Sequence, residues 1–276
     1  MSSPYADLDR PPLSERALRR ALLHEGSVWT DLRVVASTGS TNADVAAAAQ
    51  QGVPQGLVEI AESQTAGRGR LDRQWTSPPR AGLTFSVLLR PTTARQTWSW
   101  LPLLAGLAVR RAVVAVTEVE PDLKWPNDLL VGGRKLAGLL AEVHGDAVVL
   151  GVGLNVSTRA EELLPTAASL ATAGAEVLDR DTLLRAILRE LGSGYDAWTL
   201  RSGGAEQIRD EYVRHCRTVG SALRVALAGG GVVEGTGVDV DGEGRLVVRL
   251  ADGSQQTLSS GDVEHVRPAD SGEVRG

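Results

Sequence analysis

The sequence has almost no cysteine and no excess of positive charge. Its 276 residues include one cysteine, Cys216, so an internal disulfide cannot form and a reducing compartment is expected. A lone cysteine near a helix end is more often structural than nucleophilic. The 29 lysines and arginines stand against 34 aspartates and glutamates, which gives a net charge of −5. This acidic balance disfavours a protein that binds nucleic acid over its whole surface.

Long apolar runs are also lacking. The stretch MSSPYADLDRPPLSERALRR carries charges that no apolar core follows, which argues against a signal peptide. The run LLAGLAVRRAVVAV is interrupted by Arg110 and Arg111, and no run approaches the roughly 20 apolar residues of a membrane span. We therefore expect a cytoplasmic protein.

Several familiar catalytic motifs are missing. No Walker A sequence occurs, so ATP chemistry would need another phosphate cradle. No Gly-x-Ser-x-Gly nucleophile elbow occurs either. The four histidines, His24, His144, His215 and His265, show no metal-ligand spacing, and the sequence therefore assigns no metal ligands.

The two ends of the chain differ from its middle. Charges and prolines over residues 1–12 indicate a disordered lead-in, within an N-terminal segment 1–30 that holds one short helix capped by Ser14. Beyond the last helical pattern, short alternating strands are separated by GGG, DGEG and ADGS. They predict a small β barrel over 218–268, followed by a disordered tail over 269–276.

The middle of the chain, 31–217, mixes strand and helix patterns. A buried helix is expected over 98–116, and a strand that ends in a turn at Pro126 is expected over 122–131. Two strands over 134–156 should form a hairpin. Because hairpins and intervening helices alternate irregularly, the pattern predicts an α+β domain with a mixed, mostly antiparallel sheet flanked by helices.

The segment QTAGRGRLDRQW, residues 64–75, breaks every period and is expected to be a loop. Its glycines permit close approach to a ligand, its arginines suit carboxylate or phosphate oxygens, and its tryptophan offers a flat face to a base. The residues concerned are Gln64, Gly67, Arg68, Gly69, Arg70, Arg73 and Trp75. The alternative is a solvated arginine–glycine loop that binds RNA.

A second cationic segment is KWPNDLLVGGRKLAG, residues 124–138. Lys124 and Lys135 flank a turn at Asn127 and Asp128, and two lysines beside a carboxylate suit a polyanion and a metal ion. The alternative is a surface hairpin in which Asp128 only stabilises the turn.

The segment GVGLNV begins at Gly151. On a strand, Gly151, Gly153 and Asn155 share one face that is nearly bare of side chains and invites a flat ligand. The alternative is that the glycines accommodate a neighbouring helix. No third glycine and no helix follow at once, so the segment is not a dinucleotide fingerprint.

The segment GSTN places Ser40, Thr41 and Asn42 at an expected helix start. One of them should cap the helix, and the others offer neutral donors and acceptors to a polar ligand.

In this order, followed by a terminal β barrel, the four segments resemble the biotin protein ligases. The resemblance runs from about Leu32 to Pro268 and is most specific in KWPND–RKLAG and in the arginine loop. It implies a class II synthetase-like catalytic domain and an SH3-like barrel. With residues 1–30 ahead of the catalytic part, the chain resembles the enzyme-only form without a DNA-binding domain. The sequence departs from the family at Leu71 and Asp72, where many members have glycine before the third arginine.

The resemblance implies a two-step reaction. Biotin and ATP give biotinyl-5′-AMP and pyrophosphate with Mg²⁺, and a lysine of a biotin carboxyl carrier domain of an acyl-CoA carboxylase then takes the biotin. The implied biotin- and ATP-binding residues are Ser40, Thr41, Asn42, Gln64, Gly67, Arg68, Gly69, Arg70, Arg73, Trp75, Asn127, Lys135, Gly138, Gly153 and Asn155. The implied catalytic residues are Lys124, Lys135, Arg68 and Asp128.

Each end of the substrate has its implied partners. Ser40, Thr41 and Gln64 would contact the ureido ring of biotin; Arg68, Arg70, Arg73 and Lys135 would hold its carboxylate and the phosphates; Trp75 and the strand from Gly153 to Asn155 would hold adenine. Lys124 would act electrostatically, and Asp128 would orient or deprotonate the acceptor lysine. The arginine loop is expected to be mobile without ligand and to order over the adenylate.

Two rival functions come from other classes. A lipoate–protein ligase resembles the same catalytic fold, but it would need an apolar tunnel, whereas the GSTN–Gln64 set is polar. An RNA-binding module would use the arginine loop and the barrel, yet negative charge and a lack of interleaved aromatic residues disfavour it. Homodimerisation through an exposed strand edge is left open.

Overall fold

The computed structural model describes residues 10–70, 73–200, 204–227 and 230–265. The helices are α1 (Glu15–Leu22), α2 (Thr41–Gln50), α3 (Trp100–Thr117), α4 (Arg180–Leu200) and α5 (Gly204–His215), with 3₁₀ turns η1 (Arg95–Thr97) and η2 (Ala160–Glu162). The first group of strands is β1 (Asp31–Val35), β2 (Leu57–Ala61), β3 (Gly82–Leu89), β4 (Asp122–Lys124), β5 (Asp128–Val131), β6 (Arg134–His144) and β7 (Ala147–Asn155). The second group is β8 (Ala222–Ala226), β9 (Val232–Val240), β10 (Leu246–Arg249), β11 (Gln255–Leu258) and β12 (Asp262–His265).

The first group of strands forms one sheet in the order β1-β2-β3-β7-β6-β5-β4. β1 and β2 pair in parallel, and every other neighbouring pair is antiparallel. The parallel pair arises because α2 connects the two strands as a crossover, while the others are joined by turns or longer returns. The mixed, mostly antiparallel α+β fold expected from the sequence is confirmed.

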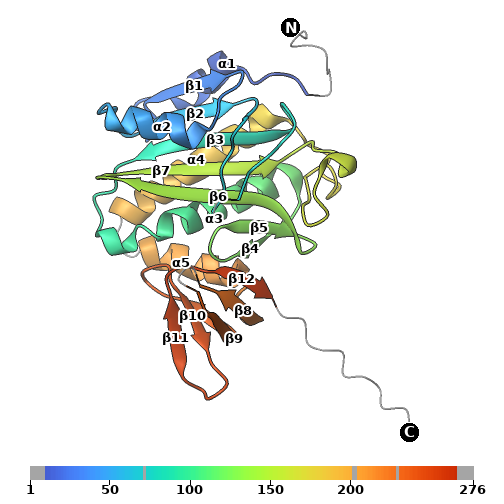
Figure 1. Cartoon of the computed structure of the whole chain (residues 1–276). Helices are drawn as coiled ribbons and strands as arrows, with labels where there is room; N and C mark the ends of the chain where they lie inside the picture. The colour runs from blue at the N-terminus through green and yellow to red at the C-terminus, as the bar shows by residue number, and fades with distance from the viewer. Residues whose placement is uncertain (1–9, 71–72, 201–203, 228–229, 266–276) are drawn as a thin grey trace.

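Helices cover both faces of this sheet (Figure 1). Four alternating side chains of β3 pack with α3 and α4 in the main core, namely Leu83, Phe85, Val87 and Leu89. Leu88 points to the opposite face and packs with Val45 of α2 in a second cluster. The strand is therefore apolar on the face toward α3 and α4, while the face toward α2 carries Leu88 beside the polar Thr84 and Ser86.

Helix α3 is 18 residues long and apolar enough to cross a membrane by length and composition, yet 67% of it is buried inside the protein. The buried helix expected over 98–116 is confirmed, and Arg110 and Arg111 lie within it. The Nε of Arg110 donates to the carbonyl oxygen of Pro121 (3.1 Å), and the Nε of Arg111 donates to Glu211 (2.8 Å). With these guanidinium groups satisfied at the helix edge, α3 serves as a core helix against the sheet and α4.

The second group of strands forms a separate antiparallel sheet in the order β11-β10-β9-β8-β12. It lies next to α5 and the β4 edge of the large sheet (Figure 1). A backbone hydrogen bond from Arg217 to the carbonyl oxygen of Leu123 (2.8 Å) ties the two parts together. The end of the predicted barrel, 266–268, and the predicted disordered tail, 269–276, lie outside the described part of the chain.

Two local expectations were wrong. The sequence predicted one strand over 122–131 that ends in a turn at Pro126. The structure has two antiparallel strands there, β4 and β5, because the chain reverses at Trp125–Asn127 and continues as a second strand. The expected disordered lead-in over 1–12 does not include Arg10, whose side chain is only 6% exposed because it is held by a carboxylate and a carbonyl oxygen. Residues 1–9 lie outside the described part. The cap of α1 is confirmed, since Ser14 accepts a hydrogen bond from the N–H of Ala17 (3.3 Å).

Candidate functional site

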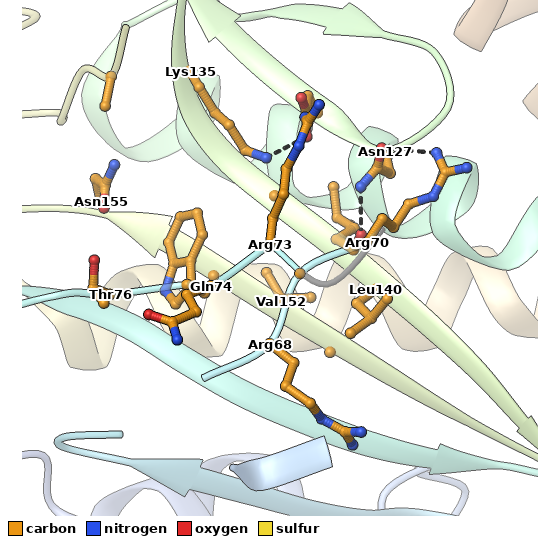
Figure 2. Close-up of a pocket in the computed structure, with 18 of the residues that line it drawn as sticks. Arg68, Arg70, Arg73, Gln74, Thr76, Asn127, Lys135, Leu140, Val152 and Asn155 are labelled. Atoms are coloured by element: carbon orange, nitrogen blue, oxygen red, sulfur yellow. Dashed lines mark hydrogen bonds and ion pairs between the residues drawn. The ribbon is translucent and has the colours of Figure 1, made fainter. Parts of the chain in front are cut away.

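One cavity of about 360 Å³ brings together nearly all the residues singled out in the sequence (Figure 2). It is lined by Ser40, Thr41, Asn42, Gln64, Arg68, Gly69, Arg70, Arg73, Trp75, Lys124, Asn127, Asp128, Lys135, Gly138, Gly153 and Asn155. Gly67 is not part of the lining. A Cβ on Gly67 would lie 2.4 Å from the carbonyl oxygen of Trp75, so this glycine shapes the loop by allowing two backbone segments to approach.

The arginine loop folds back on itself over the cavity. The N–H of Gly69 donates to the carbonyl oxygen of Arg73 (2.7 Å), and the N–H of Trp75 donates to that of Gly67 (2.9 Å). This narrow hairpin presents the side chains from both of its arms to the sheet below. The departure at residues 71–72 lies outside the described residues.

Each arginine of the loop meets a different partner. Arg68 lies 3.3 Å from a carboxylate oxygen of Glu142, and Arg73 forms an ion pair with Asp262 of β12. Arg70 donates to the Oδ1 of Asn127 (3.2 Å), as the dashed line in Figure 2 marks. Burial is the main cause that lowers the pKa of Arg70 from its usual value, and nearby Asp128 and Asp262 oppose that shift.

The two lysines of the cavity are the only lysines in the sequence. Lys135 Nζ lies 2.7 Å from Asp128 Oδ1 and 5.9 Å from the ring centre of Trp75. A Cβ on Gly138 would lie 2.9 Å from the same Nζ, so the glycine leaves room for the cation. Lys124 is the register partner of Asp128 across β4 and β5. Asp128 thus stands between the two cations and is ion-paired with Lys135.

The glycine face of β7 is occupied in two ways. A Cβ on Gly153 would lie 2.3 Å from the indole of Trp75, so the ring lies directly on the bare backbone. A Cβ on Gly151 would lie 2.2 Å from the side chain of Asn42 at the start of α2. The alternative that the glycines accommodate a neighbouring helix therefore holds for Gly151, whereas Gly153 accommodates the protein's own Trp75 ring. A flat ligand on this face stays a prediction. The Nε1 of Trp75 is buried and has no hydrogen-bond partner among the described residues.

The part of the cavity around Gln64 and the start of α2 is lined by neutral polar side chains. Gln64 Oε1 accepts from the backbone N–H of Thr41 (2.8 Å), so Gln64 caps α2. Ser40 occupies the N-cap position, but its side chain makes no cap hydrogen bond, contrary to the simplest expectation. Thr41 Oγ1 lies 2.7 Å from Ser86 Oγ, and Ser86 donates to the Oδ1 of Asn42 (2.6 Å). This network fixes the direction of each donor and acceptor.

Other lining residues escaped the sequence reasoning. They are in part Thr158, Glu162, Leu164 and Thr166 from the segment after β7, and Gly261, Asp262 and Val263 from the second sheet. No local pattern marks these residues, since the tertiary fold alone brings them to the cavity. Ser86 and Glu142, which orient lining residues, lie on strands whose alternation pointed only to packing.

The turn between β4 and β5 is held by residues of the C-terminal part of the chain. The indole N–H of Trp125 donates to the carbonyl oxygen of Gly244 (2.9 Å), and its backbone N–H donates to Thr218 Oγ1 (3.0 Å). The indole of Trp100 donates to the neighbouring carbonyl oxygen of Gly242 (3.0 Å). Two carbonyl oxygens of one turn, those of Gly242 and Gly244, therefore accept hydrogen bonds from two tryptophans of the large domain.

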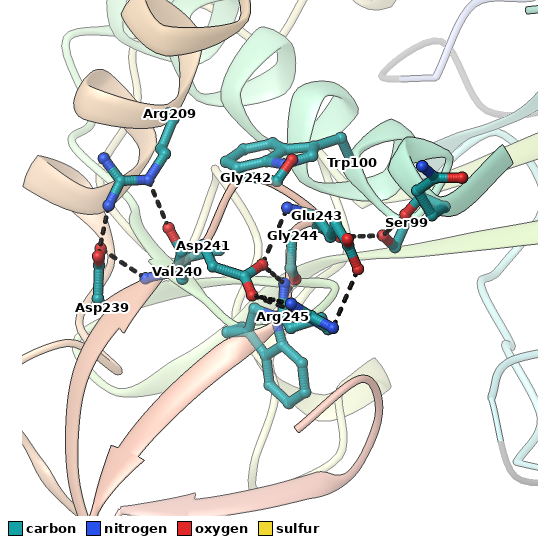
Figure 3. A network of polar contacts seen from close by, with 12 residues as sticks. Ser99, Trp100, Arg209, Asp239, Val240, Asp241, Gly242, Glu243, Gly244 and Arg245 are labelled. Carbon is teal, nitrogen blue, oxygen red and sulfur yellow. Dashed lines mark hydrogen bonds and ion pairs between the residues drawn. The ribbon is translucent and has the colours of Figure 1, made fainter. Parts of the chain in front are cut away.

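The turn that carries these carbonyl groups is itself closed by Asp241 (Figure 3). Asp241 Oδ1 accepts from the backbone N–H groups of Glu243 and Arg245, both at 2.9 Å, and Oδ2 accepts from the Nε of Arg245 (2.8 Å). Burial alone would raise the pKa of Asp241. The hydrogen bonds outweigh it, with the Arg245 side chain contributing most, and hold the pKa below its usual value.

Within the described part of the chain, no group of three or more histidine, cysteine or carboxylate side chains could hold a metal ion. The carboxylates that line the cavity are Asp128, Glu162 and Asp262. Glu162 and Asp262 are engaged with Arg10 and Arg73. This set fits Mg²⁺ held mainly by nucleotide phosphates and one carboxylate, rather than by a cage of protein ligands.

Comparison with known proteins gives a consistent result. Residues 34–157 match the biotin/lipoate A/B protein ligase family, and residues 218–266 match the biotin protein ligase C-terminal domain. The chain is 46% identical to a biotin–[acetyl-CoA-carboxylase] ligase of Mycobacterium tuberculosis, over 94% of this chain and 97% of that protein. It is 31% identical to a bifunctional ligase/repressor BirA of Bacillus spizizenii, over 90% of this chain and 76% of that protein.

The fold comparison agrees. The structure superposes on a biotin protein ligase of Aquifex aeolicus in complex with biotin and ATP with a TM-score of 0.75 and 28% identity. The match covers 87% of this chain and the whole of that one.

Proposed function

The chain belongs to the biotin/lipoate A/B protein ligase family and, within it, to the biotin–protein ligases; we propose that its cavity joins biotin to ATP and passes the biotin to a protein lysine. The Mycobacterium tuberculosis and Aquifex aeolicus relatives are named as biotin ligases, and none of the relatives named above is a lipoate ligase. Biotin is therefore the acid substrate in preference to lipoate.

The observation that carries the proposal is that three kinds of chemical group line one cavity. They are the neutral groups of Thr41 and Gln64, the cations Arg70 and Lys135, and the indole of Trp75, whose ring centre lies 5.9 Å from Lys135 Nζ. A ureido ring, a carboxylate beside a phosphate, and a purine call for these three kinds of group.

The first step brings a carboxylate to the α-phosphate of ATP, and the two anions repel each other. At about 4 Å and an effective dielectric constant near 20, that repulsion is roughly 4 kcal/mol. Arg70 and Lys135 are fixed beforehand by Asn127 and Asp128, so they can face both anions without reorganisation. Pyrophosphate leaves, and the biotin carboxylate becomes a mixed anhydride with AMP.

Mg²⁺ would neutralise charge on the phosphate oxygens when bound, and Asp128 is the carboxylate best placed to contribute to its site. The protein's own part is to hold the nucleotide where those oxygens meet Arg73 and Lys135. Closure of the arginine loop would exclude water from the anhydride.

The second step needs a neutral amine from an acceptor lysine, whose usual pKa is about 10.4. Asp128, which is ion-paired with Lys135 and is the register partner of Lys124, would orient that amine with its carboxylate. Lys124 would lower the cost of charge on the departing AMP. These residue roles form part of the proposal.

The acceptor, domain limits and compartment also belong to the proposal. The acceptor would be a biotin carboxyl carrier domain of an acyl-CoA carboxylase, in the cytoplasm. We divide the chain into an N-terminal segment 1–30, a catalytic domain 31–217, a barrel 218–268 and a tail 269–276. The described strand order of the two sheets supports the boundary near 218.

Incubation with biotin, ATP and Mg²⁺, followed by mass detection of biotinyl-5′-AMP, tests the function directly. Pyrophosphate exchange into ATP should depend on biotin and should be far weaker with lipoate. Exchange that is as fast with lipoate as with biotin would contradict the proposal.

A further inference from the structure

The stretch from Arg10 to Leu13, here named the N-terminal strap, packs against Glu62, Arg180 and the segment that follows β7. The Nη2 of Arg180 donates to the carbonyl oxygen of Pro11 (2.6 Å), and the backbone N–H of Leu13 donates to Glu62 Oε1 (2.6 Å). Arg180 and Glu62 form a buried ion pair at 2.6 Å. The strap is thereby fixed to the body of the protein.

The side chain of Arg10 reaches from the strap to the segment that follows β7. Its guanidinium donates twice to Glu162, at 3.1 and 2.5 Å, and once to the carbonyl oxygen of Ser157, at 2.9 Å. The hydrogen bond from Arg10 is the largest cause that lowers the pKa of Glu162. The last residue of η2, Glu162, and the backbone at Ser157 ahead of η2 are therefore tied to one buried cation, which holds the carboxylate in a bidentate geometry that only arginine provides.

The segment beyond η2 forms a wall of the cavity and holds the backbone of a central cation. Leu164 and Thr166 line the cavity. The N–H of Lys135 donates to the carbonyl oxygen of Thr166 (2.8 Å), and the N–H of Ala168 donates to the carbonyl oxygen of Lys135 (2.8 Å). Asn155 Nδ2 donates to the carbonyl oxygen of Ala168 (3.0 Å). The position of this segment thus sets the position of Lys135 and Asn155.

We propose that Arg10 is a positioning residue for the nucleotide end of the cavity: it anchors residues 157–162, so that residues 163–168 keep Lys135 and Asn155 in place for ATP. The inference rests on the proposed function of the cavity. The contacts of Arg10 with Glu162 and Ser157 belong to the segment after β7, whereas Thr41 and Gln64 at the biotin end are held by their own network. Because Lys135 faces both substrates and Asn155 faces only the nucleotide, loss of the anchor should affect ATP more than biotin.

The experiment measures biotin-dependent pyrophosphate exchange with each substrate varied in turn. The Arg10→Ala variant should raise the KM for ATP by about tenfold and leave the KM for biotin within about twofold. The reason is that it loses the bidentate contact between Arg10 and Glu162, which holds the wall beside the nucleotide. Arg10→Lys keeps the charge but not the fork, and it should recover part of the ATP affinity. Amide hydrogen exchange of the peptide 157–168 without ligand should quicken in Arg10→Ala.

Arg111→Ala is the matched control. Arg111 also makes a two-pronged contact with a glutamate, Glu211, but between α3 and α5, and it does not line the cavity. It should lower the melting temperature and leave the KM for ATP unchanged. The double variant Arg10→Ala/Glu162→Gln should be no worse than Arg10→Ala alone, since the second change removes a partner already lost.

The outcomes separate the inference from the function on which it rests. Equal KM values for ATP in wild type, Arg10→Lys and Arg10→Ala would overturn the inference, as would a rise confined to biotin. Unchanged hydrogen exchange over 157–168 would also overturn it, independently of activity. Absence of biotin-dependent pyrophosphate exchange in the wild type would instead overturn the proposed function.

Discussion

The indole N–H of Trp125 donates a hydrogen bond to the carbonyl oxygen of Gly244, 2.9 Å away, across the junction of the two sheets. Trp125 directly follows Lys124, and it is almost completely buried. A turn of the second sheet therefore fixes the backbone from which a cavity lysine projects. The C-terminal sheet thus supports the catalytic cavity structurally.

Replacing Trp125 by Phe should lower kcat for biotin-dependent pyrophosphate exchange by about tenfold, because the turn beside Lys124 loses its anchor. Trp100→Phe is a matched control, since it removes an indole hydrogen bond to Gly242 in the same turn but does not adjoin the cavity lysines. Equal losses of kcat in the two variants would mean that the contact is only structural.

Replacing Lys135 by Ala should reduce exchange by at least about a hundredfold, because the central cation that faces the carboxylate and phosphate is lost. Lys135→Arg keeps the positive charge and should retain a fraction of the rate. Exchange assays at saturating biotin and ATP distinguish these variants. Undiminished exchange in the alanine variant would exclude Lys135 from the first step.

The arginine loop should become resistant to trypsin when biotin and ATP are both present. Arg68 and Arg73 are each about half exposed or more without ligand, and an ordered loop over the adenylate would hide them. Mass analysis of cleavage after these residues measures the effect, and a nonhydrolysed analogue of the adenylate should act like the substrate pair. Equal cleavage rates with and without ligand would contradict the lid function.

Stability should depend on the protonation of Glu59, which is buried on β2 beside Asp44. Burial, and next the hydrogen bond with Asp44, raise the pKa of Glu59 to about 7, while Arg33 opposes the shift. A carboxyl group whose folded pKa lies above its unfolded value stabilises the fold below pH 4.5, and that stabilisation is lost as the pH rises through about 7.

Glu59→Gln mimics the protonated carboxyl group, so it should raise the free energy of unfolding at pH 8 by on the order of 2 kcal/mol and have little effect at pH 4. Denaturant unfolding at the two pH values measures the difference. Glu234→Gln, at an exposed pair with Arg224, is the control and should change little at either pH. A larger gain at pH 4 than at pH 8 would refute the assignment.

Much of the fold follows from local patterns. The hydrophobic period predicted α3 and the β6–β7 hairpin, and the Ser14 cap marked the start of α1. The prediction failed where a distant contact decided the structure. Arg10 looked like part of a polar tail because its partner, Glu162, lies 152 residues away in the sequence. Gln64 caps α2 from another loop, so the prediction that one of Ser40, Thr41 and Asn42 supplies the cap failed.

The sequence by itself determined which chemical groups are available: cations on a glycine-rich loop and on a lysine hairpin, neutral groups at a helix start, and a strand bare of side chains. These properties belong to single residues and short periods, and they do not depend on the rest of the chain. Only the tertiary structure decided their pairing and order, with Trp75 on Gly153 and Asp128 against Lys135. Such pairs form because the sheet brings separate strands within a few ångströms, and no local preference specifies which partners meet.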